Sequence, residues 1–181
     1  MAINTFIRFE VTAGKSILGE GFQKGHDGDG GWVECDDWSW DVESATSFTK
    51  GSGASVGKPV PGSFSFSHNY DKSSPTIMSM IVKGAHFALM QVDMLKTSGD
   101  DAGPKLYFQL KAKDVFITKV TSKGSGDGSV TQDVECVFKE VVLGYKMQKN
   151  DGTIDSTVRD FKWNIAKMSN AISGDIALSM S

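Results

Sequence analysis

The chain has 181 residues, of which 39% are hydrophobic and 23% are charged, and its formal net charge is −3 at pH 7. This length suits one domain around a single core, and the composition is far from that of disordered chains. Because neither sign of charge gathers into a block, the sequence argues against nucleic acid or an anionic membrane as a primary partner.

The beginning of the chain, residues 1–10, shows neither the basic region nor the apolar run of a signal peptide. No apolar stretch approaches the roughly 18 residues that a membrane-spanning helix requires. We therefore expect the protein to be made and folded in the cytosol, without membrane insertion.

Alternation of apolar and polar residues predicts about eight β-strands. The clearest alternation runs from Ser63 to His68, where serines alternate with aromatic or imidazole side chains. The other predicted strands are Ile3 to Val11, Trp32 to Val42, Phe87 to Leu95, Lys105 to Lys113, Asp114 to Thr121, Val130 to Glu140 and Val141 to Met147. Segments rich in Gly, Ser and Asp separate them and supply turns.

One helix of about residues 74–83 interrupts the strands. It has a serine cap in Ser73-Ser74, Pro75 at the first helical position and Gly84 after its end. The side chains expected on its apolar face are Ile77, Met78, Ile81 and Val82.

Together these elements predict a mainly β fold: a single-domain barrel or sandwich of about eight mostly antiparallel strands with one short helix, over residues 1–147. From Gln148 onward the alternation weakens. We interpret residues 148–181 as a C-terminal extension that docks on the barrel through Phe161 and Trp163.

Three short motifs invite a catalytic or ligand-binding interpretation, and each lacks its context. Gly53 to Gly57 matches the G-x-S-x-G serine-nucleophile motif around Ser55, but the prolines that follow argue against the helix this motif needs. Gly14-Lys15-Ser16 lacks the first glycine of a phosphate-binding loop. The acidic run from Asp27 lacks oxygen ligands at positions five and twelve of a calcium loop. The sequence therefore predicts no catalytic residue, metal or cofactor.

The cysteines and the tryptophans are better explained by structure than by chemistry. Cys35 and Cys136 lie far apart without a CxxC spacing, so we expect two reduced, half-buried thiols on strands. Trp32, Trp38 and Trp40 fall at even positions of one predicted strand. Such a row is typical of a packed core, although a row of aromatic side chains also suits a platform for bases or sugars.

The order of these features resembles the Hcp (haemolysin-coregulated protein) family of type VI secretion. The resemblance rests on Phe6-Ile7-Arg8-Phe9, Trp38-Ser39-Trp40, Phe64-Ser65-Phe66-Ser67, Asp71 to Pro75 before the helix, Gly128 to Lys139 running into Glu140-Val141, Tyr145, and the weaker Phe161-Lys162-Trp163-Asn164. The sequence departs from the family in the early loop around Gly28 to Gly30 and in the glycine-rich segment from Gly51 to Gly62.

Membership of this family implies a non-enzymatic tube protein. Six copies would close into a ring, and rings would stack into a tube propelled by a sheath behind a spike. The ring would carry effector proteins in its lumen, and the protein would leave the bacterial cytoplasm without a signal peptide. By resemblance, the long connection from Asp41 to Gly62 reaches neighbouring subunits, and the expected contact residues are Phe48, Lys50, Val56 and Pro59.

Three alternatives stay open from the sequence. A phage-like tail tube protein shares the barrel and the ring. A barrel that binds a small ligand would line its cavity with the indoles. An enzyme would depend on Ser55 and on the three histidines, His26, His68 and His86.

Overall fold

The computed structural model describes residues 4–49, 53–97 and 103–180, and it confirms a mainly β chain with one short α-helix. Its centre is a nine-stranded sheet in the neighbour order β2-β1-β12-β13-β14-β11-β6, to which β5 is added beside β1 and β15 beside β14. These strands are β1 (Thr5–Thr12), β2 (Lys15–Ser16), β5 (Trp32–Glu34), β6 (Asp37–Ser39), β11 (Phe64–Asn69), β12 (His86–Thr97), β13 (Pro104–Gly124), β14 (Val130–Gln148) and β15 (Ile154–Asn164).

Three two-stranded ribbons and two helices complete the described elements. The ribbons pair β3 (Phe22–Gln23) with β4 (His26–Asp27), β7 (Val42–Ser44) with β10 (Pro59–Pro61), and β8 (Ser47–Thr49) with β9 (Gly53–Ser55). The helices are α1 (Ser74–Lys83) and the short 3-10 helix η1 (Gly174–Ile176). In the described part of the chain, neither helix has the length and apolar character of a membrane span.

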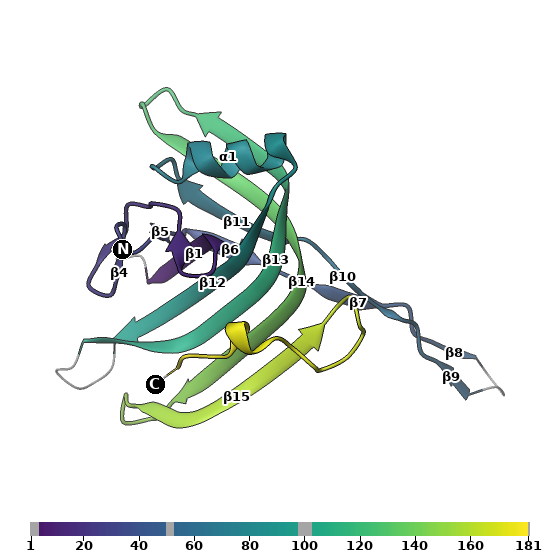
Figure 1. The fold of residues 1–181 in the computed structure, drawn as a ribbon. Coiled ribbons are helices and arrows are strands. Elements are labelled where there is room, and N and C mark those ends of the chain that lie inside the picture. The colour runs from purple at the N-terminus through teal and green to yellow at the C-terminus, as the bar shows by residue number, and fades with distance from the viewer. Residues whose placement is uncertain (1–3, 50–52, 98–102, 181) are drawn as a thin grey trace.

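The sheet curls because its two longest strands bend together (Figure 1). The sequence predicted one strand boundary at residues 113/114 and another at residues 140/141, whereas β13 and β14 run continuously through both positions. At the bend Asp114 has a φ of 52°, and the residues of β13 that enter the core change from Leu110 and Ala112 to Val115 and Ile117. Such an irregularity shifts the alternation of inward and outward residues, so it looks like a strand boundary in the sequence.

The curled sheet encloses the main core, which is rich in aromatic side chains. The rings of Phe9 and Phe87 lie 4.8 Å apart, and the ring of Phe9 lies 5.8 Å from that of Phe66. On β11 the predicted alternation is confirmed, because Phe64, Phe66 and His68 are buried.

Helix α1 covers one end of the barrel (Figure 1) and has the bounds that the sequence predicted. Ser73 makes no side-chain cap, and the Asp71 carboxylate organises this end instead by accepting the Ser73 backbone N–H at 2.9 Å. Gly84 ends the helix with a φ of 63°, a conformation that glycine adopts without strain. The predicted apolar face is wrong at Val82, which is 81% exposed.

The outer face of the sheet carries a buried polar network between the N-terminal loop and the C-terminal segment. Asp93 accepts hydrogen bonds from the side-chain nitrogen atoms of Gln91 and Gln109, and its Oδ2 lies 2.9 Å from His26 Nε2. Lys111 Nζ donates to the carbonyl of Ala177 at 2.8 Å. Burial lowers the pKa of the Lys111 ammonium, and the nearby Asp93 carboxylate opposes that shift.

The C-terminal residues contribute a strand and a segment that crosses the sheet (Figure 1). Strand β15 pairs with β14, where Trp163 is buried and Phe161 is 43% exposed. Beyond β15, Ile176 and Met180 are buried. The segment fits closely over Gly144, because a Cβ atom there would collide with Leu178 and Met180.

Candidate assembly interface

Residues 41–49 and 53–62 leave the barrel as the two sides of a narrow projection (Figure 1), which we call the arm from here on. Strands β7 and β10 form its inner part and strands β8 and β9 its outer part, both antiparallel. The predicted long connection is therefore a built hairpin that continues the pairing of β6 with β11.

Close backbone contacts fix the path of the arm. The Ser44 hydroxyl donates to the carbonyl of Gly57 at 3.0 Å, and the Thr46 N–H donates to the carbonyl of Ser44 at 3.0 Å. At Gly57 a Cβ atom would collide with the backbone of Ala45, so the strands approach more closely there than other residues allow. The two sides of the arm are thus held close together at these residues.

The expected contact residues lie along this arm. Phe48 is on β8 and is 86% exposed, Val56 follows β9 and is 77% exposed, and Pro59 lies partly buried on β10. Lys50 lies outside the described residues. An exposed phenylalanine beside an exposed valine on one ribbon is an apolar surface that fits a protein partner.

Sequence reasoning missed further exposed apolar side chains. Val42 and Val60 lie on the arm, in β7 and β10. On the β3–β4 ribbon, Phe22 is also highly exposed. For Phe22 and Val60 the available signal was their position in a Gly- or Pro-rich segment, where an apolar side chain has no regular core face to join.

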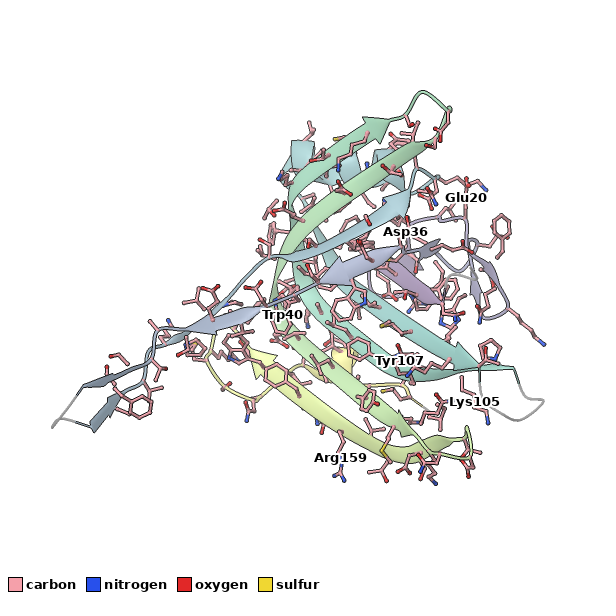
Figure 2. All side chains as sticks on the ribbon, turned by 180° about the vertical axis from the view of Figure 1, so that it is seen from behind. Glu20, Asp36, Trp40, Lys105, Tyr107 and Arg159 are labelled. Atoms are coloured by element: carbon pink, nitrogen blue, oxygen red, sulfur yellow. The ribbon has the colours of Figure 1, made fainter. Side chains whose placement is uncertain are left out.

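Trp40 marks the root of the arm (Figure 2). Its ring lies 5.4 Å from the Phe138 ring and 6.4 Å from the Phe161 ring. The ring of Trp38 stacks on those of Phe64 and Phe108 at 5.6 and 5.3 Å. Aromatic side chains thus pack against the indole rings of Trp38 and Trp40. This packing counts against the alternative in which the indoles line a ligand cavity.

The expectation of three indoles on one strand is wrong for Trp32. Between β5 and β6 the chain changes its pairing partner from β1 to β11. The Cys35 N–H still donates to the carbonyl of Thr5 on β1, whereas the Asp36 N–H donates to the carbonyl of Ser67 on β11. This crossing ends one strand and starts another. Trp32 consequently packs in a separate cluster with Phe6 and Leu95.

The histidines and Ser55 show no catalytic arrangement in the part of the chain that the structure describes. Ser55 lies on β9 and is followed by strand β10 where a nucleophile motif needs a helix. His26 contacts Asp93, the Nε2 atom of His68 lies 3.0 Å from Gln132 Oε1, and His86 stacks on Phe116.

The two other motif matches lie at turns. Gly14 sits between β1 and β2 with a φ of 76°, and its N–H donates to Glu10 Oε2. The Asp27 carboxylate accepts the N–H of Gly30 at 2.8 Å. Both segments thus have local hydrogen-bonding roles.

Both cysteines are free and fully buried rather than half-buried, and Cys35 lies between strands rather than on one. Burial, with smaller contributions from Asp37 and Asp36, raises the pKa of the Cys35 thiol to about 12. Burial also raises the pKa of the Cys136 thiol. Since the thiolate is the reactive form, both side chains are poor nucleophiles.

We therefore predict that the redox state of the buffer does not change assembly. Sizing with and without reductant should return the same oligomer. In native protein at pH 8, iodoacetamide should label neither cysteine, whereas protein in urea serves as the positive control and should react at both. A shift to smaller species on adding reductant would contradict this prediction.

Comparisons with known proteins agree with this fold. The family described as "Type VI secretion system effector, Hcp" matches residues 6–145. Protein hcp1 of Pseudomonas aeruginosa is 31% identical over 102 residues, covering 56% of this chain and 62% of that relative, which is less than two thirds of its length.

Solved structures show the same architecture. A structure titled as a type six secretion system protein aligns with a TM-score of 0.79 and 19% identity, over 93% of this chain and 99% of that one. A type VI secretion system effector from Yersinia pestis aligns with a TM-score of 0.64 and 28% identity, over 88% of this chain and 98% of that one. The curled sheet with one capping helix is thus the fold of these structures. The match to the family model over residues 6–145 shows that this chain belongs to the Hcp family.

Proposed function

We propose that this chain is a structural, non-enzymatic subunit of a type VI secretion tube. In this proposal six copies close head to tail into a ring, and rings stack. The observation that carries the proposal is the arm, which projects from the barrel with Phe48 and Val56 exposed (Figure 1). Burying such side chains against a neighbouring copy is favourable by about 25 cal/mol per Å² of apolar surface.

A head-to-tail ring also fits a molecule that has a projecting arm and, separately, a sheet edge at β6 that is unpaired within the described residues. Such contacts use two different patches on each copy, and they close when the rotation between copies fits. The short β6 edge ends the sheet on one side, and unpaired edges in β proteins need to be covered. Neighbouring copies would cover them.

The proposal extends to the partners of the tube. A polar surface runs over β6 and β11, where the hydroxyl oxygens of Ser39 and Ser65 lie 2.8 Å apart and the Ser67 hydroxyl donates to Asp37 at 2.6 Å. It supports a water-filled lumen in which effectors travel. We further propose contacts with sheath and spike proteins, and export of the cytoplasmic protein through the apparatus without a signal peptide.

Light scattering coupled to size exclusion tests this proposal. We expect a mass about six times that of the 19.5 kDa subunit. Negative-stain images should show annuli with a central hole. A strictly monomeric protein across micromolar concentrations would overturn the ring.

A further inference from the structure

The two edges of the arm differ in their backbone hydrogen-bonding groups. The Gly62 N–H donates to the carbonyl of Asp41 at 2.9 Å. Two residues further into the arm, Val60 lies opposite Glu43. In an antiparallel pair, residues that bond across alternate with residues whose N–H and C=O point to the outer edges. The register therefore places the backbone groups of Pro59 and Pro61 on the outer edge of β10.

The β10 edge is closed to a further strand. Proline has no N–H, so the outer edge of β10 offers carbonyl groups alone at Pro59 and Pro61. An incoming strand needs alternating donors and acceptors, and proline on an edge is a known means of preventing such pairing.

The β7 edge is open. By the same alternation, Val42 and Ser44 direct their backbone groups away from β10. The carbonyl of Ser44 accepts the Thr46 N–H, which leaves the N–H and C=O of Val42 and the N–H of Ser44 for a new strand. Within the described ranges, β10 is the one strand that pairs with β7.

We propose that the β7 edge, Val42–Ser44, forms backbone hydrogen bonds with strand β15 of a second copy. A ribbon of two strands is marginally stable by itself, and the arm projects away from its own barrel, so a third strand has to come from another molecule. This inference rests on the proposed function, since it specifies one contact of the ring.

The choice of β15 follows from pairing and charge. Among the described residues, β15 pairs with β14 along one edge, and its second edge is bridged only at Asn164, by Ser169. The rest of that edge is therefore available in each copy.

Strand β15 carries the exposed Arg159 (Figure 2), and the neighbouring Asp160 is paired with Lys162. The β7 side of the arm carries Asp41 and Glu43. The β7 edge of one copy would meet the β15 edge of the next, so the contact joins two different edges and is head to tail. The closed β10 edge prevents the arm from pairing with a further strand on its other side.

The decisive variant is Val42→Pro, with Val42→Ala as its matched control. Proline removes the outward N–H, whereas alanine keeps it and shortens the same side chain. The ribbon accommodates proline at these positions, because Pro61 and Pro59 lie directly opposite Val42 and Ser44. Losing this hydrogen bond, together with the steric block that the proline side chain places in the path of an incoming strand, should weaken association about tenfold or more.

We expect Val42→Pro to stay folded by circular dichroism and to dissociate at concentrations where Val42→Ala is assembled. Assembly of Val42→Pro like the wild type would overturn the β7 contact while leaving the ring proposal intact. Equal loss in both variants would assign the contact to the side chain and would also overturn it. A monomeric wild type would refute the proposed function itself.

Two further measurements do not depend on the proline variant. Hydrogen exchange of the backbone amides at Val42 and Ser44 should slow about tenfold or more in assembled protein relative to diluted, dissociated protein. For β15, Arg159→Glu should weaken association and Glu43→Arg in the same chain should restore it. Unchanged exchange would overturn the backbone pairing, and failure of the charge exchange to restore association would overturn the assignment to β15.

Discussion

Replacing Phe48 with glutamate and Val56 with lysine is expected to convert the assembled protein into a folded monomer. Both side chains lie on the arm and are largely exposed, so neither contributes to the core of its own barrel. Central apolar contacts in an interface typically contribute about 2 kcal/mol or more each, which makes the double variant at least several hundredfold weaker in association. Sizing with light scattering checks the mass.

The control for this variant is Val82→Glu. Val82 is as exposed as Phe48 but lies on α1, away from the arm. We expect Val82→Glu to assemble normally and both proteins to give the same circular dichroism spectrum. If the double arm variant retained the wild-type mass, the arm would not be the interface.

Much of the fold followed from local sequence signals because those signals have local causes. Pro75 and Gly84 define the bounds of α1 through their backbone geometry, and the alternation on β11 follows from one buried face. The bend at Asp114 was missed, since a shift in alternation has the same pattern as a new strand. Likewise, the crossing at Cys35 and Asp36 depends on hydrogen bonds to β1 and β11, which are distant in sequence.

The candidate interface was predicted in part. Exposure of Phe48 and Val56 agrees with their place in a long connection, but no local pattern predicted that this connection is a paired ribbon. The difference between its edges depends on the register that sets Pro61 against Val42. Register depends on how two segments pair, so it cannot be predicted from either segment alone. Without that pairing, the prolines at 59 and 61 indicate only a loop.

Ending the chain after Met147 is the severest test of the division proposed here, in which residues 1–147 form the barrel and residues 148–181 an extension. Of the described residues buried in the main core, Trp163 alone comes from the extension. On the outer face the extension covers Gln109, Lys111 and Glu140, whose polar side chains gain water when it is removed. We therefore expect the truncated protein to keep the barrel.

The same truncation should lower stability substantially. It removes the buried Trp163 together with Ile176 and Met180, and it leaves part of β14 unpaired. Replacing a buried tryptophan by alanine costs about 3–5 kcal/mol, which corresponds to a drop of roughly 10 °C in Tm for a domain of this size. Trp163→Ala in the full chain measures the part of the stability loss that comes from this side chain. The truncated protein should have a lower Tm than this variant. A truncated protein without β structure by circular dichroism at 25 °C would show that the extension is part of the domain, because the side chains before residue 148 would then be insufficient to hold the sheet closed.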